Sequence, residues 1–451
     1  MLRNIRRVSS SPRISSNSTS ILNHVTVTCV PGLEFILSAE LRMLGIQHQA
    51  PQSRARKRRG EIQLQNIHSK DDLFRCCLYL GTATQVRCLC GSFKARGLPE
   101  LRRKAANISW TEMLKPNAIE DGSLDIRVVS RKSKLYHTGA IRERVLESIN
   151  QHFGQKDHQE NDRDKENKNV SKTGEKSSSP VVPTVLLDIN VFEDEVQIFV
   201  NAYPTPLHQR GYRKPVAKAP LREDLAFAML FTAGWTPAWS LDATKATQNE
   251  WCGLVDPFCG SGTIAIEGAA MALGLPPGRL KEHSPFRGTV LENAESWSTI
   301  IRRSLAISKM NRLDVSISAS DRDSGAVEAT KINAIKAGVM NALTVQNVSL
   351  SGQKWFANPS VSPSSILLVT NPPFGKRISS KSSSTGLLSL FQTLCHAMRC
   401  LDREHGRRSR GIILTDNPKL LRRSGVFPFE TSFKTSHGGI KVSAMKFDAG
   451  N

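Results

Sequence analysis

Residues 254–263 read LVDPFCGSGT, an apolar run that ends at Asp256 and is followed by two glycines. The run predicts a buried strand, and the glycines let the backbone turn sharply and approach a ligand before a helix begins. Amide groups at the start of a helix bind phosphate or carboxylate. Gly260, Gly262 and Ala265 also fit the G-x-G-x-x-A fingerprint of dinucleotide-binding proteins. The stretch alone therefore leaves the ligand open, and a tight turn without a ligand is the simpler alternative.

Strand and helix signals alternate through the rest of the C-terminal half. Apolar runs at 315–319, 366–369, 411–415 and 440–447 read as strands, and the periodicity of 221–233, 327–337 and 387–401 reads as helices. This alternation predicts an α/β fold built on a doubly wound, Rossmann-like parallel sheet.

An acidic residue stands where the second strand of this series ends. Asp321 is in a position to accept hydrogen bonds from both hydroxyls of a ribose. It follows Gly262 by 59 residues, whereas the spacing typical of dinucleotide sites is about 20. The spacing disfavours NAD unless the crossover is expanded, and a surface acid without a ligand is an equally good interpretation.

Residues 370–377 read TNPPFGKR and directly follow a buried strand. The two prolines restrict the backbone, so that the carbonyls of Asn371 and Pro372 point into the cleft at the strand end. The Asn371 side chain can accept from an exocyclic amino group, and Phe374 can stack on a flipped base. A nucleobase amine is a poor nucleophile, so catalysis would come from holding it in line with a sulfonium methyl group. We therefore predict four catalytic residues: Asn371, Pro372, Pro373 and Phe374.

Composition indicates a polyanionic partner. The chain has 451 residues and a net charge of +22, and no apolar run is long enough to span a membrane. Residues 34–154 are the most densely basic, with 21 basic and 12 acidic side chains. The nine cysteines form no CxxC pair and no zinc-binding spacing, which predicts reduced thiols and no metal.

The first 20 residues contain four arginines, seven serines and no acid, which is typical of an organellar transit peptide. We assign residues 1–23 to such a peptide and expect a mitochondrial or plastid protein. A basic tail on a cytoplasmic protein is the alternative.

Residues 24–205 also read as α/β, and 206–451 as the second domain. Residues 155–183 are charged and of low complexity, which predicts a disordered loop. Strands at 185–191 and 196–200 follow it around the turn Glu193-Asp194, a hairpin pattern. The loop is therefore expected to interrupt a domain.

Taken together, the chain resembles the THUMP-domain guanine-N2 RNA methyltransferases, and is most similar to the branch that includes the bacterial 23S rRNA enzymes. Besides DPFCGSGT and NPPFGKR, the matching segments are PGLE (31–34), FKAR (93–96), SRKSKLYHT (130–138), LHQRGYR (207–213) and APLREDLA (219–226). The resemblance implies a Rossmann-like, class I methyltransferase domain that binds S-adenosylmethionine (SAM), preceded by an α/β THUMP region that binds RNA.

The resemblance also implies roles for individual residues. Cofactor binding falls to Asp256, Phe258, Gly260, Gly262, Thr263, Asp321 and Asn347. Within this set, Asp256 and the glycines would line the methionine portion, Asp321 would hold the ribose, and Asn347 stands near the adenine, where the family often has an acid. RNA contacts are expected from Arg54, Arg56, Lys57, Arg58, Arg59, Arg131, Lys132 and Lys134. Two basic stretches also have an interpretation without RNA: residues 54–59 would form a solvated loop, and residues 407–410 a solubilising turn.

The expected reaction is methylation of guanine N2 in structured RNA, the large-subunit ribosomal RNA of an organelle. The same reaction on tRNA, adenine-N6 methylation and a non-catalytic role in ribosome assembly stay open. Some bacterial relatives carry a second methyltransferase domain. No residue follows Asn451 to build one here, so a single methylation is expected.

Overall fold

The computed structural model describes residues 22–51, 60–120, 123–154, 184–213, 220–239, 251–308, 315–352, 365–374, 383–405, 408–425 and 427–448. Several predicted features lie outside these residues. They are most of the transit peptide, the basic cluster Arg54, Arg56, Lys57, Arg58 and Arg59, the 155–183 loop, and Gly375 to Arg377 after the NPPF motif. No helix within the described ranges is long and apolar enough to cross a membrane.

The chain divides into two compact units. Unit 1 comprises residues 1–25, 87–204 and 286–292, and unit 2 comprises 26–86, 205–285 and 293–451. The structure thus groups 26–86 with the C-terminal half, whereas the sequence pattern suggests one division near residue 205.

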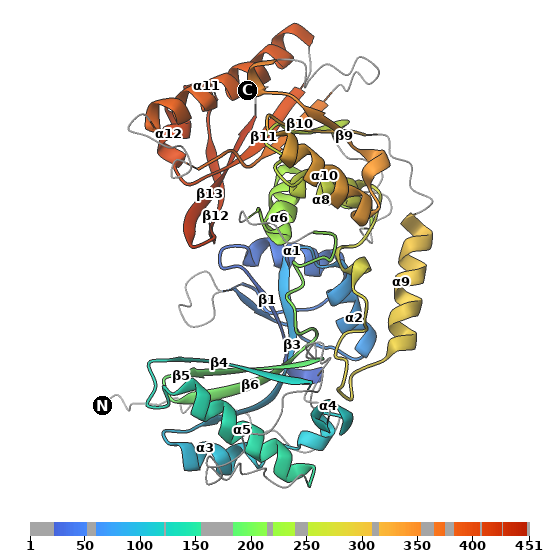
Figure 1. Cartoon of the computed structure of the whole chain (residues 1–451), viewed down its shortest axis with the longest axis vertical. Helices are drawn as coiled ribbons and strands as arrows, with labels where there is room; N and C mark the ends of the chain where they lie inside the picture. Colours follow the sequence, from blue (N-terminus) through green and yellow to red (C-terminus); the bar gives the residue numbers. More distant parts are fainter. Residues whose placement is uncertain are drawn as a thin grey trace, which may run out of the picture. The chain divides into compact units, whose positions relative to one another are not determined.

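Unit 2 is built on a seven-stranded sheet in the order β12-β13-β11-β10-β7-β8-β9. Figure 1 labels β9, β10, β11, β12 and β13 of this sheet. The strands are β7 (Gly253–Asp256), β8 (Ser316–Asp321), β9 (Thr344–Asn347), β10 (Ser365–Thr370), β11 (Arg408–Thr415), β12 (Glu430–His437) and β13 (Ile440–Asp448). The pairs from β9 to β11 are parallel, while β13 is antiparallel to both β11 and β12. The predicted α/β fold is confirmed, with an antiparallel edge that the sequence pattern had not indicated.

Helices cover both faces of this sheet because successive strand residues point in opposite directions. They are α6 (Glu223–Ala233), α8 (Thr263–Ala272), α10 (Ser324–Ala337), α11 (Ser383–His405) and α12 (Pro418–Arg422), whereas α9 (Ala294–Ser308) packs against α2 (Lys70–Tyr79). On one face Val255 joins a core with Leu387, Phe391, Leu394 and Met398 of α11. On the other, α8 packs so closely on Leu254 that a Cβ at Gly268 would lie 2.3 Å from it.

The crossover from β7 to β8 is long because it contributes to both units. It contains α8, a 3-10 turn at Pro277–Leu280, and α9. Between these, residues 286–292 belong to unit 1. This expansion accounts for the wide spacing between Gly262 and Asp321.

The N-terminal part of unit 2 contains β1 (Val25–Cys29) from Thr26 onward, α1 (Glu34–Met43), β2 (Glu61–Gln63) and α2 (Lys70–Tyr79). β3 (Ala83–Lys94) begins in unit 2 and continues into unit 1 from Arg87. The six-stranded sheet to which these strands belong has the order β2-β1-β3-β6-β5-β4.

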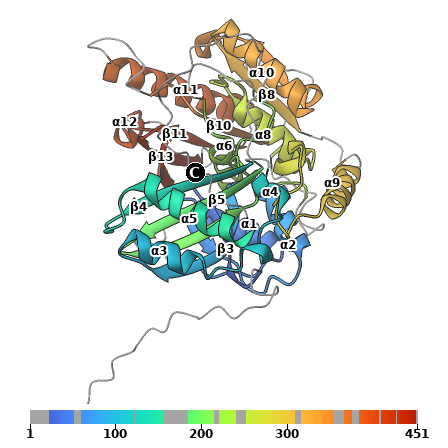
Figure 2. The same cartoon turned by 60° about the horizontal axis from the view of Figure 1, so that its bottom comes forward.

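Unit 1 contains β4 (Leu124–Arg131), β5 (Val185–Phe192), β6 (Glu195–Asn201), α3 (Leu98–Ala105), α4 (Asn117–Glu120) and α5 (Thr138–His152). The helices α3 and α5 lie side by side on one face of the strands (Figure 2). β5 and β6 form the predicted hairpin, and Glu193 and Asp194 have the positive φ of 51° and 65° that a tight two-residue turn requires. β4 and β5 pair in parallel, and the chain between them contains α5 followed by residues 155–183.

Candidate active site

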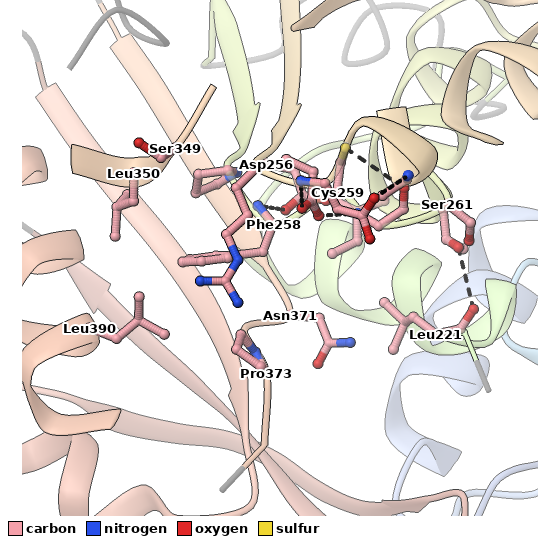
Figure 3. Close-up of a pocket in the computed structure, with 18 of the residues that line it drawn as sticks. Leu221, Asp256, Phe258, Cys259, Ser261, Ser349, Leu350, Asn371, Pro373 and Leu390 are labelled. Atoms are coloured by element: carbon pink, nitrogen blue, oxygen red, sulfur yellow. Dashed lines mark hydrogen bonds between the residues drawn. The ribbon is translucent and has the colours of Figure 1, made fainter. Parts of the chain in front are cut away.

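A cavity of about 930 Å³ lies in unit 2 where β7, β8 and β10 end. The carboxyl ends of parallel strands are the usual ligand site of this fold, because the loops that follow them diverge there. Lining residues labelled in Figure 3 come from the end of β7 and the loop after it, from the loop after β10, from the segment after β9 and from α11, and Leu221 comes from the segment before α6.

The two glycines of the loop after β7 serve different purposes. Gly260 has a φ of +55° and lines the cavity, and no atom lies within 4 Å of the position that a Cβ would take there, so its backbone is open to a ligand. Gly262 has a φ of +83°, and a Cβ there would lie 2.6 Å from Cγ2 of Thr330. Gly262 is therefore required for packing of α10, and it is not among the lining residues.

Asp256 is the most buried acid of the cavity, with 1% of its surface exposed. Its Oδ1 accepts from Oγ1 of Thr370 at 2.7 Å and from the amide of Phe258 at 3.2 Å. Burial raises the pKa of Asp256 to about 7, because a carboxylate loses hydration there. The bond to Thr370 joins the end of β7 to the end of β10. It therefore links the LVDPFCGSGT motif to the TNPPFGKR motif.

Asp321 ends β8 and lines the cavity as its position in the sequence predicts. One carboxylate oxygen accepts from the amide of Gly260 and the other from the amide of Asp323, each at 3.0 Å. These bonds fix the side chain at the mouth of the glycine loop. Each oxygen keeps a second lone pair, which is what a ribose hydroxyl needs.

Asn347 lies at the end of β9 but is not among the lining residues. Its side-chain amide donates to the carbonyl of Asp321 at 2.9 Å. The cavity is lined instead by the segment that begins two residues later, Ser349 to Ser351. Asn347 therefore supports the backbone of Asp321. The neighbouring wall of the cavity consists of Ser349, Leu350 and Ser351.

The NPPF motif follows β10 and reaches the cavity with two of its four residues, Asn371 and Pro373. The Asn371 Oδ1 is buried and has no hydrogen-bond partner among the residues that the structure describes. Phe374 is 5% exposed and is outside the lining; its ring meets His437 edge-on at 6.4 Å. Stacking of a base on Phe374 stays a prediction.

The structure adds lining residues that sequence analysis missed. One face of α11 contributes Gly386, Ser389, Leu390 and Thr393, at helical positions i, i+3, i+4 and i+7. Gly386, Ser389 and Thr393 are small or polar, whereas Leu390 is apolar and also packs against the core. The small and polar positions stand on another face than the apolar core stripe of the same helix, and that contrast is the signal that the sequence contained.

Arg213 holds another part of the wall, formed by Leu221. Its guanidinium donates to the Leu221 carbonyl at 2.8 Å and to Oγ1 of Thr263 at 2.7 Å, and it pairs with Glu223 at 3.4 Å. Thr263 and Leu221 both line the cavity. The sequence predicts that this helix begins at Leu221, but α6 begins at Glu223. The carbonyl of Leu221 therefore lies outside the helix and can accept from Arg213.

The predicted RNA-contact residues Arg131, Lys132 and Lys134 are exposed in unit 1, around the end of β4. Asp194 orders this segment, because its carboxylate accepts from the amide of Lys134 at 2.9 Å. The interpretation of 407–410 as a solubilising turn is wrong for its described part. Arg410 lies within β11 and donates two hydrogen bonds to Asp448, at 2.8 and 2.9 Å.

No group of three or more potential metal ligands occurs among the described residues. What the cavity does bring together is a glycine loop after β7, an acid after β8 and an Asn-Pro-Pro-Phe turn after β10. On a sheet of five parallel strands with an antiparallel β12–β13 edge, this arrangement defines a Rossmann-like methyltransferase domain.

Comparison with known families agrees. Residues 210–424 match the family model described as "RMKL-like, methyltransferase domain".

Full-length comparisons extend the likeness beyond this domain. The chain is 27% identical to ribosomal RNA large subunit methyltransferase K/L of Marinomonas sp. (strain MWYL1), over 96% of this chain and 54% of that protein. It is also 27% identical to the protein of that name from Syntrophotalea carbinolica, over 93% of this chain and 53% of that one. The chain thus spans about half the length of the curated relatives it matches.

Solved structures share the fold over most of the chain. SMU.472, crystallised in complex with SAH, has a TM-score of 0.70 and 21% identity, covering 94% of this chain and 97% of that one. TrmN from Thermus thermophilus has a TM-score of 0.60 and 19% identity, covering 94% and 99%.

Proposed function

We propose that this protein transfers a methyl group from SAM to the exocyclic N2 of a guanosine in large-subunit ribosomal RNA. The observation that carries the proposal is the buried Oδ1 of Asn371, which has no partner among the described residues and belongs to a side chain lining the cavity. A buried acceptor left unpaired costs about 1–3 kcal/mol. An N–H group of a nucleobase amine removes that cost.

The rest of the cavity suits SAM. Asp256 and Gly260 would hold the methionine portion, since a carboxylate attracts its cationic groups and Gly260 lets it approach the backbone. Asp321 would accept from the ribose hydroxyls, and the wall from Ser349 to Ser351 would face the adenine. The volume of about 930 Å³ is near the upper end of the roughly 300–1,000 Å³ typical of ligand sites. It therefore has room for a cofactor and a base together.

When bound, SAM supplies an electrophilic methyl group. The residues of the chain supply geometry: Asn371 accepts one hydrogen of the amine, and the adjacent prolines keep the loop rigid. Orienting a weak nucleophile in line with its electrophile is a large catalytic effect without a strong base.

Ribosomal RNA as the substrate is supported by the names of the curated relatives and by the resemblance of the N-terminal half to THUMP-containing enzymes. The exposed Arg131, Lys132 and Lys134 of unit 1 suit phosphate contacts. If they bind RNA, the affinity falls steeply with salt, and reversing their charges reduces that slope.

The test is to incubate the recombinant chain with SAM and unmodified large-subunit ribosomal RNA and to analyse the nucleosides by mass spectrometry. N2-methylguanosine is expected. The Asn371→Ala variant is expected to lose roughly a hundredfold or more in rate while calorimetry shows SAM binding within about twofold of wild type. Asn341→Ala, an exposed asparagine in a 3-10 turn, is the matched control and should behave as wild type.

Other outcomes would replace parts of the proposal. Methylation of tRNA alone would change the substrate, and N6-methyladenosine would change the base. SAM binding without transfer to any of these RNAs would favour an assembly factor.

We also propose import into a mitochondrion or plastid, on the basis of the arginines and serines of residues 1–20. Residues 1–23 fused to a fluorescent protein should direct it to one of these organelles, and a diffuse cytoplasmic signal would contradict the proposal.

A further inference from the structure

Phe374 ends the described part of the NPPF turn, and its position determines how the turn meets the cavity. Pro373, the residue before it, lines the cavity, while the Phe374 ring is buried. The ring is met by His437, with the centroids 6.4 Å apart and the planes at 77°. An edge-to-face pair of this kind is worth about 0.5–1.5 kcal/mol beyond burial and fixes ring orientation.

His437 is held by a rigid hairpin. It is the last residue of β12, is 6% exposed and pairs in register with Ile440, the first residue of β13. The turn between them is Gly438-Gly439, with positive φ at both residues. A two-residue turn with these angles permits little slippage of the strands.

The same hairpin is contacted by the PGLE turn near the N-terminus, which lies in the same unit. The hydroxyl of Thr435 donates to the carbonyl of Pro31 at 2.9 Å. Gly32 has a φ of +102°, and a Cβ there would lie 2.0 Å from the Lys434 carbonyl oxygen. This contact therefore tolerates no side chain at position 32.

Glu34 explains why the turn is well formed. One of its carboxylate oxygens accepts from the amide of Gly32 at 2.8 Å, and the other accepts from the amide of Gly60 at 2.7 Å. Pro31 and Gly32 thus contact β12 directly, and Glu34 holds the turn that carries them.

We propose that His437 is a positioning residue for methyl transfer: it holds Phe374, and thereby sets Asn371 and Pro373 at the cavity, while the PGLE turn sets His437 through β12. The inference rests on the proposed function for its kinetic consequence. It assigns to the PGLE motif a role in the geometry of a catalytic turn more than 300 residues away in sequence.

The kinetic test compares His437→Ala with His437→Phe. The alanine variant is expected to lower kcat roughly ten- to a hundredfold, because small misplacements of a catalytic turn have effects of that size. The KM for SAM should change less than about twofold, since His437 is not a lining residue. His437→Phe should recover most of kcat, because it restores a ring edge against Phe374. Phe433→Leu, another buried change on β12, is the control for lost stability and should retain kcat.

A second measurement does not depend on methyl transfer. With 4-fluorophenylalanine placed at position 374, the ¹⁹F spectrum reports the ring environment directly. His437→Ala and Gly32→Ala should both shift or broaden the resonance. Gly338→Ala should not, because Gly338 has a similar φ of +71° but no atom within 4 Å of its Cβ position.

An unchanged resonance in His437→Ala, or an unchanged kcat, would overturn the inference. If the variants show the expected ¹⁹F differences but the wild-type protein methylates no RNA, the proposed function is refuted. The contacts from the PGLE turn through β12 to Phe374 would still be supported.

Discussion

Asp256 is the residue whose ionisation most directly concerns the site. It is buried, it faces the cavity, and its pKa is raised to about 7. A group with a raised folded pKa keeps its proton in the folded state at pH values where the unfolded chain has lost it. Its contribution to stability is therefore full below its unfolded pKa and declines as the pH rises toward 7.

We expect the free energy of unfolding to fall between about pH 4 and 7, and Asp256→Asn to make that slope shallower. Urea denaturation across this range measures the effect. SAM should bind more tightly to the wild type as the pH rises through about 7, because the ionised carboxylate attracts its cationic groups. An equal pH slope of stability in the variant would contradict this assignment.

The two glycines of the loop after β7 allow a sharper test at the same scale. Gly260→Ala places a Cβ in open space in the cavity, whereas Gly262→Ala places one against Thr330. The first should weaken SAM binding more than it lowers stability, and the second should do the reverse. Because Cγ2 of Thr330 is the nearest atom, at 2.6 Å, adding Thr330→Ser to Gly262→Ala should restore part of the lost stability. Calorimetry and thermal unfolding of the three variants check this, and no rescue would argue against the packing role.

At the scale of elements, α11 separates two functions on opposite faces. Phe391 is 1% exposed in the core, whereas Ser389 is exposed and lines the cavity. Phe391→Ala should lower the free energy of unfolding by about 3–5 kcal/mol. Ser389→Ala should change it by less than about 0.5 kcal/mol, and its effect should appear in ligand affinity. Urea denaturation and calorimetry on both variants measure the difference, and similar stabilities would contradict the division of faces.

Sequence patterns predicted most elements of the sheet, because an apolar strand such as 366–369 is recognisable from its own residues. They did not predict the direction of β13. They also missed β12, because most of its residues are polar and only two of them are buried. Pairing direction depends on which strand is the neighbour, and that is a non-local choice. Asn347 was expected at the cavity, but the cavity wall begins two residues later, at Ser349. This position also depends on non-local packing, which the sequence pattern does not reveal.

At the scale of the whole molecule, the segment 286–292 is the unusual feature, since it leaves the β7–β8 crossover and belongs to unit 1. Its residue Thr289 bridges to Leu114, and the carbonyl of Gly288 accepts from the amide of Lys115 at 3.0 Å. Lys115 also pairs with Glu292 at 2.8 Å. Residues of the β7–β8 crossover thus form part of the packing of unit 1.

Gly288→Ala should destabilise unit 1, because φ is +75° and a Cβ would lie 2.7 Å from Val185. A left-handed alanine costs about 1–2 kcal/mol before any clash. Lys115→Ala should cost less than about 1 kcal/mol, since its partly exposed ion pair is screened by solvent. Hydrogen exchange should show faster exchange in β5 for Gly288→Ala with β10 unchanged. Equal protection of β5 in the wild type and the glycine variant would contradict this role.

The sequence by itself determined the order of the motifs, the α/β class and the likeness of residues 210–424 to the matched family model, because strand periodicity and turn residues are local properties of the chain. Tertiary structure decided the rest. It buried Phe374 under His437, assigned Gly262 to helix packing, turned one face of α11 toward the cavity and divided a crossover between two units. Each of these outcomes depends on atoms brought together from distant parts of the chain, and close packing, which neighbouring residues do not encode, selects among them.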